Sequence, residues 1–509
     1  MFCRYYPSYR CSVSGVRYRR QVTAPDSAEA TAPVGDDVTT DAAAEAFDDL
    51  DALVSASVAP DARWAEGDDH ATALTWIDPA QVADASPAAD GDDAASLFSG
   101  AHLRSAVVRP GVLVPVGVLL ALVGAYTGAT LLWPLHEIAP TVQAVEFSTT
   151  PAQAAAITWP AQGSAAVGIA GVGTLASSTD PAAIASISKV VSAMMVLDRM
   201  PLAPGEQGPS FSFTRADSQS YLAYKRSDQS ALDVPVGGSL TEYQMLQGVL
   251  LGSANNYIDR LAKEIWGSDA AFADAAATWL SERGISGITI KSPSGFDERN
   301  VATPEALIAV AQKAMQNPVF AEIVGTTSVD LPGAGTVRNT NGMMADSGVV
   351  GVKTGTLHES WNLLTAKDVT VGDTTLRLYA SVLTQEDDDM RLASTRSLFS
   401  QVESELQTQA PTVPEGTVVG SVETLWGAEV DIVTDADADV VLWNGGIATT
   451  TVEFDLDEKR KAGAEVGTLT TTGPVNTATT ELELAGTVQD PSPWWRLTHP
   501  LELFGLTDK

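Results

Sequence analysis

Cysteine and histidine are scarce in this chain of 509 residues, and their scarcity excludes several kinds of chemistry. Both cysteines, Cys3 and Cys11, lie in the first eleven residues, so the rest of the chain offers no disulfide, no thiolate nucleophile and no cysteine ligand for a metal. Beyond residue 140 the histidines are His358 and His499, too few for a histidine-rich metal site. We therefore expect no metal centre.

Basic residues are also in a minority, with 30 Lys and Arg against 64 Asp and Glu and a net charge of −34. A surface of this charge repels nucleic acid, so we expect no nucleic-acid partner. Residues 21–100 carry eighteen acids against Arg63 alone and are rich in Ala, Asp, Thr and Pro. Because such a segment buries too little apolar surface to offset its conformational entropy, we assign 1–103 as a disordered acidic tail.

A long apolar run follows the tail, and no charged residue lies between Arg109 and Glu137. At about 1.5 Å per residue, a helix over 110–133 can cross a hydrocarbon core about 30 Å thick. This run predicts a single-pass protein of the cell membrane. Because basic residues precede the run, the positive-inside rule predicts its orientation. The tail is then cytoplasmic, where it could bind a partner, and the rest is extracytoplasmic. A cleavable signal peptide is the alternative, but it normally starts near the N-terminus.

The rest of the chain predicts two folded parts. Helical spacing in "VVSAMMVLDRM" and "YQMLQGVLLGSANNYIDRLAKEI", together with a strand pattern in "TLRLYASVLT", indicates a mixed α/β domain over 150–405. Pro411 and Pro414 mark a linker. After them, "VDIV", "VVLW", "TVEFDL" and "TTELELAG" alternate apolar and polar residues, which predicts a small β-rich domain over 412–509.

A serine and a lysine stand three residues apart in "IASISKVVSAMMV", residues 184–196. This spacing puts Ser186 and Lys189 on one helical face, within hydrogen-bond reach. The residues that follow are apolar nearly all round, which indicates a buried helix. Burial and the positive end of the helix dipole would both lower the pKa of the lysine, as a general base requires. The alternative, favoured by these residues alone, is a lysine that extends its charge to water.

Ser253-Ala-Asn255 follows an apolar helical run, "MLQGVLLG", where Gly252 is expected to end the helix and expose a loop. An ordinary turn is the alternative interpretation. The stretch "VVGVKTGTL" is a third motif, in which a lysine and two hydroxyls on a strand edge could hold a carboxylate. Its glycine would allow close approach, and a plain strand-to-turn transition is the alternative. The residues concerned are Lys353, Thr354, Gly355 and Thr356.

The three motifs occur in the order S-x-x-K, S-x-N and K-T-G, a set typical of penicillin-recognising serine enzymes. Residues 150–405 resemble the D-alanyl-D-alanine carboxypeptidases among the low-molecular-mass penicillin-binding proteins. The similarity extends to "GGSLTEYQMLQGVLLGSANNYIDRLA", to the "PSG" turn in "IKSPSGFDERNVATPEAL" and to "RNTNGMM". It implies an α+β catalytic domain of the serine β-lactamase/DD-peptidase type, an antiparallel sheet flanked by helices, followed by a small all-β domain.

The resemblance also implies roles for the motif residues. Ser186 would attack the penultimate D-Ala carbonyl of a peptidoglycan stem peptide ending in D-Ala-D-Ala, forming an acyl-enzyme, while Lys189 accepts its proton. Ser253 would relay a proton to the departing D-Ala amine, and Lys353 would tune it electrostatically. Asn255 would position Lys189 and the substrate amide.

The same resemblance implies how the substrate is held. The K-T-G segment would bind the terminal carboxylate through Thr354, Gly355 and Thr356, with Arg391 as a helper because of its place after the strand "LRLYASVLT". The backbone N–H groups of Ser186 and Thr356 would form the oxyanion hole. β-Lactam antibiotics would act as inhibitors, and the reaction would need no cofactor.

Two other functions remain open. A class A β-lactamase would deacylate with a glutamate in an E-x-x-L-N run, but residues 256–352 contain none, and Glu305 opens "EALI" without the asparagine. An inactive penicillin-binding, wall-associated module is the other alternative. The intact set of Ser186, Lys189 and Lys353 argues against it.

Overall fold

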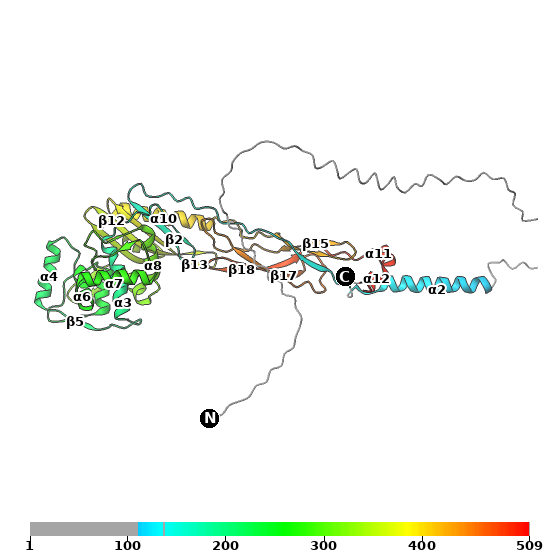
Figure 1. Cartoon of the computed structure of the whole chain (residues 1–509), viewed down its shortest axis with the longest axis horizontal. Helices are drawn as coiled ribbons and strands as arrows, with labels where there is room; N and C mark the ends of the chain where they lie inside the picture. The colour runs from blue at the N-terminus through cyan, green and yellow to red at the C-terminus, as the bar shows by residue number, and fades with distance from the viewer. Residues whose placement is uncertain (1–109, 136–137, 508–509) are drawn as a thin grey trace, which may run out of the picture. The chain divides into compact units, whose positions relative to one another are not determined.

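The computed structural model describes residues 110–135 and 138–507 (Figure 1). The predicted tail, 1–103, and the charged residues on which the predicted orientation depends lie outside the described residues. The chain divides into two compact units, one of which contains the helix before Trp133 and the other the residues from Trp133 onward. Each unit is described by itself.

Helix α2 (Pro110–Leu132) carries no charged side chain over its 23 residues. Among the described residues it is the one helix long and apolar enough to cross a bilayer. At about 1.5 Å per residue its length is about 34 Å, which matches the hydrocarbon thickness. The helix is continuous through Pro115.

A five-stranded sheet forms the centre of the second unit, with every neighbouring pair antiparallel. Its order brings β2 beside β13, a strand that follows more than two hundred residues later. In spatial order the strands are β11 (Val349–Leu357), β12 (Ser360–Val371), β13 (Thr374–Gln385), β2 (Ser164–Ile169) and β3 (Gly173–Ala176).

Helices cover both faces of this sheet, so its strands are apolar on both sides. Leu378 and Val382 of β13 pack with Leu398 and Phe399 of α10 (Asp388–Gln407). Tyr379, between them in sequence, belongs to the core on the other face. This double burial explains the nearly continuous apolar run in "TLRLYASVLT". The α+β class predicted from the sequence is confirmed.

Helix α3 (Ser188–Arg199) runs through the core on the second face and is buried from Ser188 to Leu197. It packs against α5, α6, α7 and α8, because its apolar residues leave no solvent-facing stripe. The surrounding helices are α4 (Arg215–Arg226), α5 (Glu242–Leu250), α6 (Asn255–Trp266), α7 (Asp269–Glu282), α8 (Pro304–Ala314) and α9 (Pro318–Val324). Short strands join them: β4 (Ala182–Ala183), β5 (Ser210–Ser212), β6 (Ser239–Thr241), β7 (Ile288–Thr289), β8 (Val301–Ala302), β9 (Ser328–Leu331) and β10 (Gly335–Arg338).

A six-stranded antiparallel sheet follows the linker, in the order β1-β14-β15-β18-β17-β16. Its first strand, β1 (Thr141–Ala144), pairs with β14 across about 280 residues, so this sheet draws on chain from both sides of the central sheet. The predicted limits 412–509 do not include that strand. The others are β14 (Val418–Glu423), β15 (Glu429–Thr434), β16 (Thr449–Phe454), β17 (Glu465–Thr472) and β18 (Thr477–Leu484).

The strand predicted for "VVLW", residues 440–443, is wrong. This segment is not part of a sheet, since the N–H of Val440 is bonded to the Thr412 hydroxyl and that of Val441 to the Asn476 side chain. Its alternation has another cause: Val441 and Trp443 pack in one core, while Val440 and Leu442 pack in another.

Glu242, the first residue of α5, makes the stability of the fold depend on pH. Its side chain is buried, and neither carboxylate oxygen has a hydrogen-bond partner among the described residues. The loop containing Gly208 packs against it so closely that a Cβ on that glycine would lie 2.6 Å from Glu242 Oε2. Burial raises the pKa of Glu242 to about 7.

Because the folded state holds a proton that the unfolded state releases, the stability due to protonated Glu242 is full below about pH 4.5 and is lost as pH rises through about 7. We expect Glu242→Gln to raise the free energy of unfolding at pH 8 by about 1–3 kcal/mol, the usual cost of an unpaired buried polar group, and to have little effect at pH 5. Thermal unfolding of the full chain at both pH values measures this. Glu206→Gln, at an exposed neighbour, should show no such gap, and an equal effect of Glu242→Gln at both pH values would contradict the prediction.

Candidate active site

Ser186 lies in a single turn of 3₁₀ helix, η4 (Ala185–Ile187), immediately before α3. Lys189, in the first turn of α3, is fully buried and its Nζ is 2.7 Å from Ser186 Oγ. Nζ also donates to Asn255 Oδ1 and to the backbone oxygen of Ser294, each at 2.6 Å. The lysine therefore does not extend to water, and the alternative favoured by local sequence is wrong.

Burial lowers the pKa of Lys189 to about 7, although the charge of Asp259 acts in the opposite direction. A large fraction of the side chain is therefore neutral near physiological pH. A neutral amine has two N–H groups and one lone pair. The oxygens of Asn255 and Ser294 can accept both N–H groups, which turns the lone pair toward the hydroxyl of Ser186.

Ser188, the neighbouring serine, is engaged in the structure of the turn. Its Oγ donates to Ala185 O at 2.8 Å and accepts from Asn300 Nδ2 at 2.8 Å. Asn300 also binds the backbone at both Lys291 and Ser292. This asparagine thus ties the start of α3 to the loop that carries Ser294.

The "PSG" turn contributes a backbone group to the site. Ser192 Oγ donates to Pro293 O at 2.7 Å, which fixes the turn along α3. Gly295 has φ +77°, and a Cβ there would lie 2.0 Å from Ala185 O. The sequence showed this turn only as part of the resemblance. The contact between Ser294 O and Lys189 has no side-chain signature that could have revealed it.

The S-x-N segment joins α5 to α6. Asn255 is the first residue of α6, and its Nδ2 donates to Gln229 Oε1 at 2.8 Å while its oxygen faces Lys189. Ser253 is buried and has φ +57°. Gly252 was expected to end the helix and expose a loop. Instead, α5 ends at Leu250, and the residue with a left-handed backbone conformation in this turn is Ser253. A Cβ on Gly252 would instead meet Val337 at 2.8 Å, so glycine is needed there for packing.

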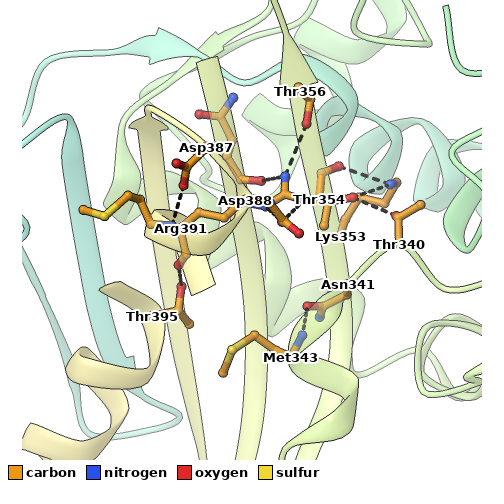
Figure 2. A network of polar contacts seen from close by, with 12 residues as sticks. Thr340, Asn341, Met343, Lys353, Thr354, Thr356, Asp387, Asp388, Arg391 and Thr395 are labelled. Atoms are coloured by element: carbon orange, nitrogen blue, oxygen red, sulfur yellow. Dashed lines mark hydrogen bonds and ion pairs between the residues drawn. The ribbon is translucent and has the colours of Figure 1, made fainter. Parts of the chain in front are cut away.

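The K-T-G segment lies in β11, at the edge of the central sheet. Lys353 is buried, and its Nζ donates to Thr354 O at 3.1 Å (Figure 2). Burial lowers the pKa of Lys353 well below its ordinary value, and the charges of Lys189 and Arg391 lower it further. A Cβ on Gly355 would lie 2.5 Å from Ile184 O, so only glycine lets this strand approach the turn that carries Ser186.

Arg391 of α10 reaches the same end of the strand (Figure 2). Its Nη1 donates to Thr356 Oγ1 at 3.3 Å and to Asn362 O at 3.1 Å. Asp388 holds the guanidinium at 2.6 Å, and the ring of Trp361 lies below it at 4.9 Å. A cation and a hydroxyl are thus fixed side by side, an arrangement suited to an anionic ligand.

Thr354 is the other hydroxyl of the motif, and it faces the segment before β11. Its Oγ1 is 2.7 Å from the hydroxyl of Thr340. Asn341, the next residue, donates to Gly351 O at 3.1 Å and so holds this segment against the strand. The "RNTNGMM" stretch therefore supports β11 from its unpaired side.

Asp259 is a residue that the sequence analysis missed. It lies one turn after Asn255 on α6, where the spacing alone suggests nothing more than a polar position. Tyr224 donates to its Oδ2 at 2.9 Å, and burial raises the pKa of Asp259 to about 6. It lines an open hollow beside the site together with Tyr224, Gln229, Ser294 and the half-exposed Phe296.

An α+β fold in which a buried lysine faces a serine at a helix start, between an S-x-N loop and a K-T-G edge strand, defines the class of penicillin-recognising serine hydrolases. Comparison with known proteins agrees. Residues 174–386 match the family model of the D-alanyl-D-alanine carboxypeptidases, peptidase family S11. The resemblance stated from the sequence is confirmed.

Two curated relatives are D-alanyl-D-alanine carboxypeptidases. DacB2 of Mycobacterium tuberculosis is 30% identical over 151 residues, which cover 29% of this chain and 47% of the relative. The enzyme of a Streptomyces strain is 29% identical over 187 residues, covering 33% and 62%. The chain thus spans about half to three fifths of the length of these relatives. The solved DD-transpeptidase of that strain is similar with a TM-score of 0.42 and 23% identity, covering 48% of this chain and 98% of the other.

The close approach of Gly295 to Ala185 can be tested by adding one methyl group. We expect Gly295→Ala to lower the free energy of unfolding by about 2–4 kcal/mol, because the backbone of either turn must move as well as adopt a strained φ. Gly267→Ala is the matched control, since Gly267 has the same φ of +77° but open space around it, and it should cost about 1 kcal/mol. Chemical denaturation of both variants measures the difference, and equal losses would contradict the packing argument.

Proposed function

We propose that this chain is a serine-type D-alanyl-D-alanine carboxypeptidase that removes the terminal D-Ala from peptidoglycan stem peptides through an acyl-enzyme on Ser186. The observation that carries the proposal is the buried Lys189 amine, which lies 2.7 Å from Ser186 Oγ and whose pKa is lowered to about 7. The family match over 174–386 supports the reaction class.

In acylation, neutral Lys189 accepts the hydroxyl proton as Ser186 Oγ attacks the carbonyl of the penultimate D-Ala. The negative oxygen that develops is stabilised by the backbone N–H groups of Ser186 and Thr356. Ser253 then relays a proton to the amine of the departing D-Ala. The fixed acceptors Asn255 and Ser294 O support this step, because they keep the lysine in one orientation throughout.

Recognition of the terminal carboxylate falls to the end of β11. Thr354 and Thr356 supply hydroxyl donors, Gly355 gives access to the backbone, and Arg391 supplies a fixed cation. Lys353 adds charge as well: its pKa is lowered in the free enzyme, and a substrate carboxylate nearby would favour its ammonium form. A β-lactam carries a comparable carboxylate beside its reactive carbonyl, and the same groups would hold it.

Deacylation returns the enzyme to its starting state. Once the D-Ala amine has left with its proton, Lys189 is again neutral and can activate a water molecule against the ester of Ser186. The acid and base roles therefore pass between the same groups in both halves of the reaction. No cofactor takes part in these steps.

We also propose that α2 anchors the protein in the cell membrane as a single span, with the N-terminal tail cytoplasmic and the catalytic segment outside. The apolar length of α2 supports the span. The basic residues before it support the orientation. In this arrangement 150–405 is the catalytic domain, 412–509 contributes the small β-rich domain, and the acidic tail is free to bind a cytoplasmic partner.

Fluorescent penicillin and a diacetylated L-Lys-D-Ala-D-Ala peptide test the activity on the full chain. We expect a long-lived adduct on Ser186 and released D-Ala. Lys189→Ala should slow adduct formation by about 10²–10⁴, the usual contribution of a general base, whereas Lys263→Ala, at an exposed lysine of α6, should not. Rapid release of the drug would favour a β-lactamase, absence of the adduct an inactive binding module, and an unchanged rate in Lys189→Ala would remove it as the base.

The pH dependence of adduct formation tests the environment of Lys189. Because the base must be neutral, we expect the rate to rise with pH through about 7. Asp259 raises the pKa of Lys189, so Asp259→Asn should move this rise to lower pH, by about 1 unit. Asp269→Asn, at another residue lining the same hollow, should leave it nearly in place, because the charge of Asp269 does not act on the pKa of Lys189. A shift toward higher pH in Asp259→Asn would contradict the assignment.

A further inference from the structure

We propose that the hollow beside Lys189 binds the side-chain amine of the substrate, on the residue that precedes the two D-Ala residues. The ligand is a diamino acid of the stem peptide, whose side chain carries an ammonium group. Asp259 and Asp269 bind that group, and the ring of Phe296 contacts the carbon chain. This inference rests on the carboxypeptidase reaction given under the proposed function, and it adds the chemical class of the residue that the enzyme selects.

The hollow shares residues with the catalytic network. Its volume is about 460–520 Å³ in scale with a single side chain or small ligand, at 520 Å³. Ser294, which lines it, accepts from Lys189 Nζ at 2.6 Å through its backbone oxygen, and the same Nζ is 2.7 Å from Ser186 Oγ. Gln229, a second lining residue, accepts from Asn255 Nδ2 at 2.8 Å. The hollow therefore adjoins the site of acylation.

The direction of the substrate brings one side chain to this place. Under the proposed function the terminal carboxylate binds at the end of β11, and the penultimate carbonyl lies at Ser186. The preceding residue of the peptide then continues past Ser186, by about 3.3–3.6 Å in an extended chain. Since the penultimate D-Ala has only a methyl group, the side chain of the residue before it is the first that is long enough to enter a hollow next to Lys189.

The lining of the hollow is acidic. It contains Asp259, Asp269 and Asp297, and the described residues that line it include no Lys, Arg or His. Arg299 binds Asp297 and offsets its charge, whereas the printed partner of Asp259 is the neutral hydroxyl of Tyr224. The charge of Asp269 raises the pKa of Asp259, so the two carboxylates act on each other. A cation bound beside them would relieve this repulsion.

Aromatic side chains give the hollow a second property. Phe296 is 43% exposed, although it directly follows the closely packed Gly295. An exposed ring beside carboxylates suits a ligand that has both a carbon chain and a positive charge, because the chain packs on the ring and the ring face attracts the cation. A bare metal ion makes no use of such a ring, and no group of three or more His, Cys, Asp or Glu among the described residues could hold one. The lining therefore favours an organic ammonium group.

Two peptides that differ at one amine test this inference on the full chain. Both are L-Lys-D-Ala-D-Ala with an acetylated α-amine, and the side-chain amine is either free or acetylated. From released D-Ala we expect kcat/KM to be about tenfold higher for the free amine, as for a hydrogen bond to a charged group. Asp269→Asn and Asp259→Asn should each bring the ratio of the two kcat/KM values close to one. This ratio cancels any effect of Asp259 on the base, because both peptides are acylated by the same Lys189.

Asp274→Asn is the matched control, since Asp274 lies on α7 like Asp269 but does not line the hollow, and it should keep the ratio. Equal kcat/KM for the two peptides in the unchanged enzyme would overturn this inference while the carboxypeptidase reaction stands. A preference that persists in both hollow variants would overturn it as well, because the amine would then be bound elsewhere. No release of D-Ala from either peptide would overturn the proposed function and this inference together. Adduct formation with fluorescent penicillin shows that each variant is folded.

Discussion

The burial of the Lys189 amine against three oxygen atoms is the interaction on which the catalytic segment depends. A buried amine without partners is costly by several kcal/mol, so each acceptor must be held in place. The acceptors come from three separate parts of the chain: Ser186 in the turn before α3, Asn255 at the start of α6 and Ser294 in the "PSG" turn. The hydrogen bonds to Lys189 Nζ therefore fix the relative positions of these three segments of the chain.

The same burial sets the electrostatics of the site. Lys189, Lys353 and Arg391 are all buried, and the charges of Lys189 and Arg391 lower the pKa of Lys353. Asp259 offsets part of this positive charge at Lys189, and Asp388 does so at Arg391. A cluster of buried basic side chains favours the binding of an anionic group.

Sequence patterns predicted the parts of this structure that are determined by residues close together in the chain. The helix after Ser186, which is apolar nearly all round, and the strand "TLRLYASVLT", which is buried on both faces, were predictable. Burial on every side requires an apolar residue at nearly every position. The Ser294 carbonyl could not be found in this way, since any residue has one. Asp259 was equally hidden, because a carboxylate one turn after Asn255 is ordinary on a helix until the fold buries it beside a lysine.

Long-range pairing was the other limit. The strand Thr141–Ala144 is short and mostly exposed, and it is recognisable only by its partner β14, about 280 residues away. The error at 440–443 is the converse case, where true alternation came from two cores rather than from a sheet. Period-two patterns report that side chains face two ways, and they do not say what binds the backbone between them.

Strain at the two serine-bearing turns links the stability of the fold to the site. Ala185, just before Ser186, has φ +50°, and Ser253 has φ +57°, conformations that cost about 1–3 kcal/mol each for residues other than glycine. Each is held by neighbours: Ser188 Oγ and the Gly295 turn fix Ala185, and the bond from Ala254 N to Gly248 O closes the turn at Ser253. The buried length of α3 and the helices around it supply the rigidity that these turns require. The core of this segment therefore does more than stabilise the fold, because without it neither serine-bearing turn would keep this backbone geometry.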